Sequence, residues 1–203
     1  MIRVPQSGTC VLVTIAWLGE IGCQMQLRRP NTTPTRMIEP QVVERQQSVP
    51  ATQSKKAANA TPIRLLDTQA LGHIGRPLLR RQANGELTEN SVCRWSSAPD
   101  RYLDTALRLA IESDPNLRLV DTSRAPELAA TLLVWDLEEN GGTRLVGSVQ
   151  FSVDRGRPRG PHIEVVRTSE PVSAELPGDL AAAAGRLLGR LASEGLSYIA
   201  SVR

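Results

Sequence analysis

The chain has 203 residues and a formal net charge of +3, with only 3% aromatic residues and two histidines. This length allows one domain with a hydrophobic core and additional segments. The arginines are scattered and are not grouped with aromatic residues, which argues against a nucleic-acid-binding protein. His73 and His162 lie in expected loops or strand ends, so metal binding and histidine-based catalysis have little support, and we expect no cofactor.

The N-terminus has the features of an export signal. Arg3 gives a short positive region, and an apolar run follows from Cys10 to Leu18. This run is too short for a membrane-spanning helix, which needs about 20 residues, but it suits the apolar region of a secretory signal. The next residues, up to Cys23, resemble a bacterial lipoprotein cleavage site, in which Cys23 receives the lipid. Glu20 departs from that pattern, because leucine is usual there. A misassigned start or an uncleaved leader is the alternative.

The following stretch predicts a linker. Residues 24–61 are rich in Pro, Gln, Thr, Ser and Asn and have no sustained apolar period. Such a stretch has too little apolar area to offset the entropy lost on ordering. We therefore expect a leader at 1–23, a disordered linker at 24–61 and a folded domain at 62–203. Cys93 is expected to be unpaired and to behave as a small buried hydrophobe, since the three cysteines have no metal or redox spacing.

The first half of the domain predicts short strands and one helix. Strands are expected at 63–67, 77–81, 87–95 and 117–121. An amphipathic helix is expected at 99–114, where Ser96 or Ser97 can cap the N-terminus, Pro99 suits the first turn, and Pro115 ends the helix. The residues at helical spacing on its apolar face are Leu103, Ala106, Leu107, Ala110 and Ile111.

The second half predicts a long hairpin, a further strand and a second helix. Leu133, Trp135 and Leu137 alternate before the turn residues 140–142. On the return strand one face carries apolar residues, namely Leu145, Val149, Phe151 and Val153. A strand is expected at 163–168. Asp179 is the expected N-cap of a helix whose apolar stripe consists of Leu180, Ala183, Ala184, Leu187, Leu188 and Leu191.

This order of elements predicts an α+β layer sandwich. Two helices, each with one apolar face, are expected to pack on the same face of an antiparallel or mixed sheet. The glycines Gly185 and Gly189 lower the helix propensity of the second helix and are candidates for close helix–sheet contact. The predicted architecture is therefore a single curved sheet covered on one side.

The segment from about Ile63 to Ala200 resembles the ABC-type transport auxiliary lipoproteins, the family of the paraquat-inducible accessory lipoprotein. The most specific feature is the run from Arg94 to Pro99, since members typically show a tryptophan and a proline at this strand-to-helix junction. The strand with Arg80 and Arg81, the long hairpin and the Ala- and Leu-rich C-terminal helix complete the resemblance. The chain departs from the family at 69–75, where members commonly have a loop with tyrosine and proline.

The resemblance implies a periplasmic, non-catalytic accessory subunit that is anchored to the outer or inner membrane by an N-terminal lipid. The implied partners are a mammalian-cell-entry (MCE) type substrate-binding protein, an ABC permease and a cytoplasmic ATPase. The chain itself has no phosphate-binding loop. Edge strands allow a homo-oligomer. The alternatives are a stand-alone outer-membrane lipoprotein with a role in envelope structure or assembly, and a periplasmic hydrolase, which the absence of nucleophile-elbow glycines disfavours.

The candidate interface residues belong to the two strands before the first helix. Trp95 is interpreted either as a core residue whose indole N–H bonds a backbone carbonyl, or as an exposed residue at a partner contact. Arg80, Arg81 and Arg94 are candidates to line one strand edge and meet an acidic partner surface; solvated arginines on a sheet face are the alternative. No catalytic set of serine, histidine and carboxylate can be assembled from the sequence.

Overall fold

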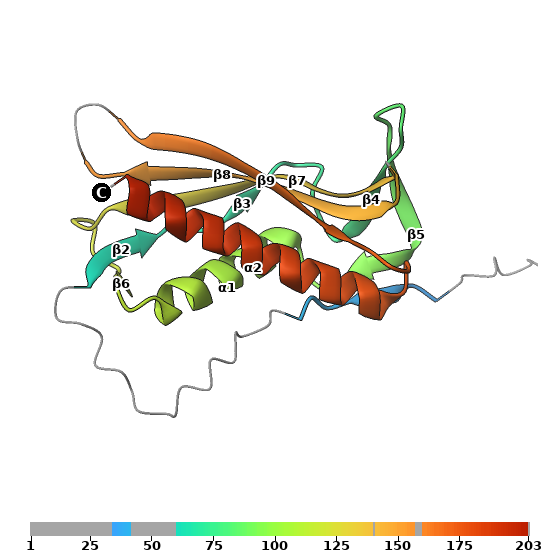
Figure 1. Cartoon of the computed structure of the whole chain (residues 1–203), viewed down its shortest axis with the longest axis horizontal. Coiled ribbons are helices and arrows are strands. Elements are labelled where there is room, and N and C mark those ends of the chain that lie inside the picture. Colours follow the sequence, from blue (N-terminus) through green and yellow to red (C-terminus); the bar gives the residue numbers. More distant parts are fainter. Residues whose placement is uncertain (1–33, 42–59, 140, 157–159, 203) are drawn as a thin grey trace, which may run out of the picture. The chain divides into compact units, whose positions relative to one another are not determined.

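The structure, a computed structural model, describes residues 34–41, 60–139, 141–156 and 160–202. The expected leader, including Cys23, lies outside the described residues, as does most of the expected linker. The described residues contain, in chain order, β1 (Arg36–Ile38), β2 (Thr61–Leu65), β3 (Gln69–Ala70), β4 (Pro77–Arg81), β5 (Leu87–Trp95), α1 (Pro99–Ser113), β6 (Leu117–Leu119), β7 (Glu127–Glu139), β8 (Thr143–Asp154), β9 (His162–Pro171) and α2 (Pro177–Ser201). Strands and helices combine into an α+β fold, which confirms the predicted class (Figure 1).

The long strand β7 is the centre of the mixed sheet. One of its edges pairs with β8 in antiparallel direction along almost its whole length, and β9 pairs with the far side of β8. The other edge is divided among β2, β3 and β4, each of which runs parallel to β7. The sheet continues from β2 to β6 and from β4 through β5 to β1.

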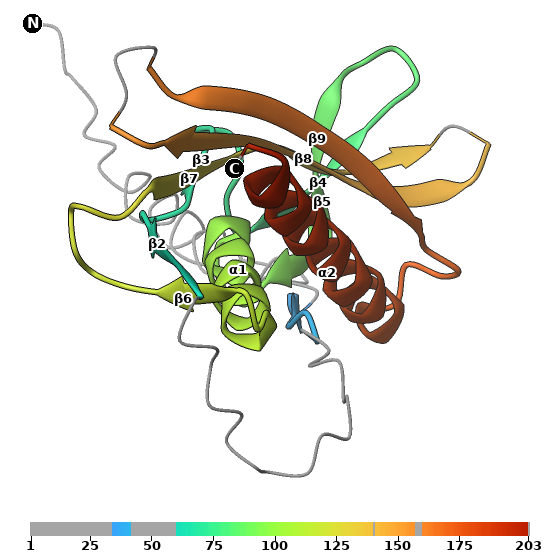
Figure 2. The ribbon, with the colours of Figure 1, turned by 60° about the vertical axis from the view of Figure 1, so that its left-hand side comes forward.

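Both helices cover the same face of the sheet, as predicted, and the core lies between them and the strands (Figure 2). We refer to this side as the helix face and to the opposite side as the open face. The predicted stripe of α2 is completely buried. Glycines allow α2 to approach the sheet: a Cβ at Gly195 would lie 2.8 Å from the Phe151 ring, and one at Gly147 would lie 2.9 Å from Leu191. Neither described helix has the combination of length and apolarity that a membrane span requires.

The starts of the helices differ from the prediction. Ala98 is the N-cap of α1, and Leu176 is that of α2, so neither Ser96 nor Ser97 caps α1, and Asp179 does not cap α2. Instead, Ser96 Oγ and the backbone N–H of Ser97 contact the Tyr102 hydroxyl at 2.5 and 2.7 Å. Both helices have proline in the first turn, where its missing N–H removes one of the donors that a cap would satisfy.

Strand β7 changes the direction of its side chains midway. Leu128 and Leu132 are fully buried on the helix face, and after a register shift between Leu132 and Val134 the buried residues are Trp135 and Leu137. Leu133 is only partly buried, so its predicted alternation with Trp135 is wrong. A bulge inserts one residue into the ladder and shifts the period-two pattern by one position, which the sequence pattern did not reveal.

Residues Thr35–Gln41, which we term the strap, belong to the folded unit, so the prediction of disorder is wrong for them. Within the strap, β1 pairs in parallel with the last three residues of β5. Ile38 is 1% exposed, and Pro40 is also buried. Two buried side chains and a three-residue strand give no sustained apolar period, so composition alone predicts a linker here.

Candidate functional site

Strand β4 presents its two arginines on opposite faces of the sheet, because consecutive strand residues alternate. Arg80 lies on the helix face and forms ion pairs with Glu139 and with Glu175, which precedes α2. Arg81 lies on the open face. Arg94 is exposed and is the register partner of Pro77, at the other end of β4. The prediction that the three arginines line one strand edge is therefore wrong.

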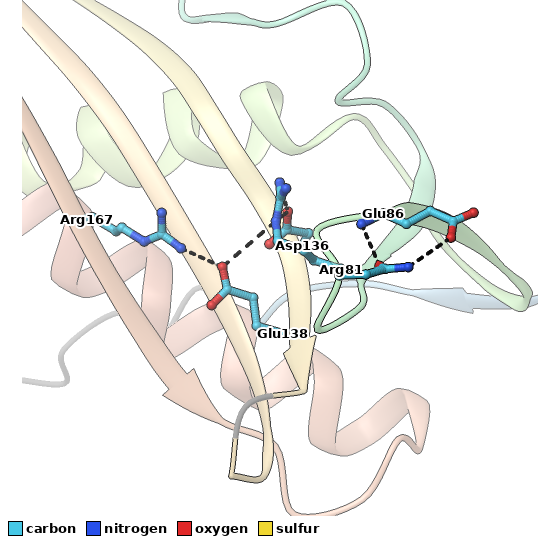
Figure 3. Close-up of polar contacts among 6 residues, drawn as sticks. Arg81, Glu86, Asp136, Glu138 and Arg167 are labelled. Carbon is cyan, nitrogen blue, oxygen red and sulfur yellow. Dashed lines mark hydrogen bonds and ion pairs between the residues drawn. The ribbon is translucent and has the colours of Figure 1, made fainter.

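A chain of charged side chains crosses the open face from β4 to β9 (Figure 3). Arg81 donates two hydrogen bonds to Oδ2 of Asp136, with distances of 3.0 Å from Nε and 2.6 Å from Nη2. Glu138 lies 3.9 Å from Arg81 Nε and accepts a hydrogen bond of 2.5 Å from Arg167 Nη2. These four residues form the ion network, which connects β4, β7 and β9.

Asp136 is the most deeply buried member of the ion network, with 2% of its surface exposed. Burial raises the pKa of Asp136 above its ordinary value, although the hydrogen bonds and the charge of Arg81 lower it. Its second oxygen, Oδ1, has no hydrogen-bond partner among the described residues. Both described hydrogen bonds to this carboxylate come from Arg81, so loss of that arginine would leave a buried charge unpaired.

A second buried carboxylate fastens β9 to α2 on the helix face. Glu170 is 2% exposed and lies between two arginines on successive turns of α2. Arg186 Nε donates a hydrogen bond of 2.9 Å to Oε2 of Glu170. Arg190 Nε lies 2.9 Å from Oε1 as an ion pair, but without hydrogen-bond alignment, so Oε1 has no hydrogen bond within the described chain. These contacts hold one edge of the sheet against the helix.

Trp95 is a core residue. Its side chain is 0% exposed, and its ring centroid lies 5.7 Å from that of Trp135, with an angle of 59° between the planes. The burial excludes a direct contact of this ring with a partner on the folded surface. The predicted bond of its indole N–H to a carbonyl is also wrong, since Nε1 has no acceptor in the described residues. Cys93 is buried as predicted, and its burial raises the pKa of the thiol.

Sequence reasoning missed the open edge of strand β9, which is a candidate binding feature. Among the described strands it pairs with β8 alone, so the other edge of its ten residues is open. Ile163 and Val165 lie on the open face with 59% and 55% of their surfaces exposed, more than any other large apolar side chain in the described strands. The alternation of these residues with Glu164 was the available signal, because it predicts an apolar side and a charged side of an edge strand.

We describe two pockets on the surface of the described residues. The larger, of about 410 Å³, lies between the loop before β7 and the end of β8, and includes Ser123, Glu127 and Asp154. The smaller, of about 80 Å³, is bordered by Asp67, Asp100 and Asp104. Neither pocket includes a histidine, and no group of three or more metal-ligating side chains in the described ranges is arranged to hold an ion.

Comparison with known proteins identifies the fold. No family model matches the chain, and no curated protein matches it in sequence. A solved structure of an uncharacterized protein is similar, with a TM-score of 0.59 and 10% identity, and covers 68% of this chain and 92% of its own. Protein XCC0632 from Xanthomonas campestris, described by the family model DUF330, has a TM-score of 0.59 and 15% identity, with coverages of 79% and 89%.

A third similar structure is the hypothetical protein CT253 from Chlamydia trachomatis, with a TM-score of 0.52, 11% identity and coverages of 69% and 95%. Each of these three proteins is covered almost completely by the described domain and its neighbouring residues. At these identities the likeness establishes the fold and does not extend to an activity. The described unit thus shares the fold of these three solved structures.

Proposed function

We propose that the protein is a non-catalytic accessory subunit of an MCE-type ABC lipid transport system in the cell envelope, tethered to a membrane by a lipid on Cys23. The sequence resemblance to the ABC-type transport auxiliary lipoproteins supports this assignment. The fold shared with the DUF330 protein from Xanthomonas campestris is consistent with it. In this role the domain binds neighbouring subunits and holds them in position, and does not transform a substrate.

The single observation that carries a binding function is the open edge of β9. An unpaired strand edge offers a row of backbone N–H and C=O groups to an extended segment of another protein. Ile163 and Val165 add apolar area to that edge, and Arg167, a member of the ion network, adds an exposed cation beside them. In strand addition, backbone pairing supplies affinity, and side-chain contacts such as these supply specificity.

The pockets give no support to the hydrolase alternative. A hydrolytic site of the serine type needs a nucleophile within about 3 Å of a base, commonly a histidine. Ser123 in the larger pocket has Glu127 and Asp154 in the same lining, but neither His73 nor His162. These two pockets thus lack the histidine base that such a site commonly uses.

The proposal is tested by co-purification of the tagged, full-length protein from membranes. We expect the MCE-domain protein and the permease to co-purify with the wild type. The paired variant Ile163→Ser and Val165→Ser should lose them, whereas Leu176→Ser, which changes an equally exposed apolar residue outside the sheet, should keep them. Retention of the partners by the paired variant contradicts the role of β9. Absence of transporter subunits from the wild-type sample contradicts the proposal and favours the stand-alone lipoprotein.

A further inference from the structure

The strap occupies a groove that is built from three separate elements. The edge of β5 pairs with β1, so that Ile38 lies opposite Trp95. The backbone N–H of Ser96 donates a hydrogen bond of 2.9 Å to the carbonyl of Ile38. The Tyr102 hydroxyl, on α1, donates one of 3.3 Å to Glu39. Figure 1 shows the strap, in blue, beside β5 and below the first turns of α2.

Helix α2 closes this strap groove at a glycine. A Cβ at Gly185 would lie 2.8 Å from the carbonyl carbon of Gln41 and closer still to its oxygen, a separation that real Cβ atoms do not show. Only a residue without a side chain lets the strap backbone pass there. Gly189, one turn later, has no atom within 4 Å of the corresponding position. Gly185 is therefore required by the strap, and Gly189 is its matched control.

The strap has the features of a bound peptide. It enters as an extended segment, buries Ile38 and Pro40, and leaves Met37 48% exposed. Its next described neighbour along the chain is Ala60, so 18 residues (42–59) lie between the strap and the next described residue. A segment attached in this way binds its groove as an intramolecular ligand, at an effective concentration on the order of millimolar.

We propose that the strap groove is a peptide-binding site that takes the strap of the same chain as a detachable ligand, and that its occupancy sets how far the domain stands from the membrane. The second part rests on the proposed function, because it requires the lipid on Cys23. With the strap bound, roughly 12 residues separate Cys23 from the domain, a reach of about 40 Å at about 3.4 Å per residue. With the strap released, the domain begins at Thr61, and roughly 38 residues allow about 130 Å.

The chemistry of the groove defines its ligand. The ligand is an extended peptide that runs parallel to β5, with an apolar side chain at the position of Ile38, a carboxylate next to it and a proline after that. The apolar side chain enters the core beside Trp95, and the carboxylate accepts from Tyr102. Within the described sequence the strap is the segment seen to meet these requirements, which favours binding in cis.

The first test uses a fluorescent peptide with the sequence of residues 34–41 and the full-length protein. In Ile38→Asp the strap cannot bury its anchor, so the groove is free, and we expect this variant to bind the peptide at least tenfold more tightly than the wild type, in which the strap competes. Adding Gly185→Ala to Ile38→Asp should abolish this binding, and adding Gly189→Ala should not. Ile38→Ala provides a milder form of release if Ile38→Asp fails to fold.

Failure of the folded release variants to bind the peptide, or equal effects of Gly185→Ala and Gly189→Ala, would overturn the proposal. A wild-type protein that is dimeric, and that Ile38→Ala makes monomeric, would show that the groove takes the strap of a second copy, and would overturn binding in cis. Neither result depends on a lipid anchor, so this test is separate from the proposed function.

The second test measures the reach. The lipidated protein is placed in vesicles, with a donor dye at Ser152→Cys on β8 and acceptor dyes on the lipid headgroups. We expect lower energy transfer in Ile38→Ala than in the wild type, since release of the strap lengthens the tether. Equal transfer in both proteins would refute the effect on reach. Failure of the protein to join vesicles at all would refute the anchor on Cys23 and leave the peptide result unaffected.

Discussion

Replacement of Arg81 by methionine tests how the open face is held together. Methionine keeps much of the aliphatic volume but removes both hydrogen bonds to Asp136, which is 2% exposed. Breaking a buried ion pair by removing one partner costs about 3–5 kcal/mol. The Arg81 side chain is itself 31% exposed, and solvent screens part of its charge. We therefore expect a loss of about 3 kcal/mol in the free energy of unfolding at neutral pH, at the lower end of that range.

The same substitution should have a cost that depends on pH. Burial already raises the pKa of Asp136 in the folded protein. A carboxyl group with a raised folded-state pKa gives stability that is fully present below its unfolded pKa and is lost as pH rises through the folded value. Arg81 lowers this pKa, so Arg81→Met raises it further. The destabilisation should be large at neutral pH and should shrink in acid, where Asp136 is protonated in both proteins.

Urea unfolding, followed by the fluorescence of the buried Trp95 and Trp135, measures these differences. The double variant Arg81→Met with Asp136→Asn should lose less stability than the sum of the single variants, because no buried charge is left unpaired. Arg144→Met, which removes an exposed arginine from the same face, should change stability by no more than about 0.5 kcal/mol. A cost below about 1 kcal/mol for Arg81→Met, or the same cost in acid and at neutral pH, would refute the reasoning.

Further substitutions test the core, the helix packing and the anchor. Trp95→Ala should cost about 3–5 kcal/mol in urea unfolding, and Trp95→Phe should cost less, since the cavity is smaller and no indole hydrogen bond is lost. A cost below about 1 kcal/mol for Trp95→Ala would contradict its place in the core. Gly195→Val should lower the melting temperature because of its contact with Phe151, and Gly189→Val should lower it less. Cys23→Ala should move the protein from membranes to the soluble fraction, and unchanged fractionation would count against the lipid anchor.

The helices and the hairpin could be predicted from sequence because each buries one face, and this gives its apolar residues a regular spacing. Leu103 and Leu107 in α1, and Leu187 and Leu191 in α2, are fully buried as their spacing indicates. The bulge in β7, after which the opposite set of side chains faces the helices, could not be predicted, since an inserted residue such as Leu133 is as apolar as its neighbours. A bulge is set by the paired strands and not by the local pattern.

The candidate site was harder to predict, because its contacts join distant parts of the chain. Arg81 meets Asp136, 55 positions later, only because β4 and β7 pair in parallel in one particular register. The sequence did contain one signal: Asp136 interrupts an apolar strand, and a buried carboxylate requires a cation. The position of the strap was even harder to predict from the sequence. It depends on Gly185, which leaves room for the carbonyl group of Gln41.

The shared edge of β7 also constrains the order of assembly during synthesis. Strands β2, β3 and β4 all find their partner in residues 127–139, so a nascent chain that ends before this point cannot complete its sheet. Until then only the β4–β5 hairpin and α1 can form from local contacts, and their apolar surfaces stay unpaired. Sheets that depend on such distant pairing fold slowly and expose aggregation-prone intermediates. We therefore expect fragments truncated before Glu127 to be insoluble, in contrast to fragments that include β7 and β8.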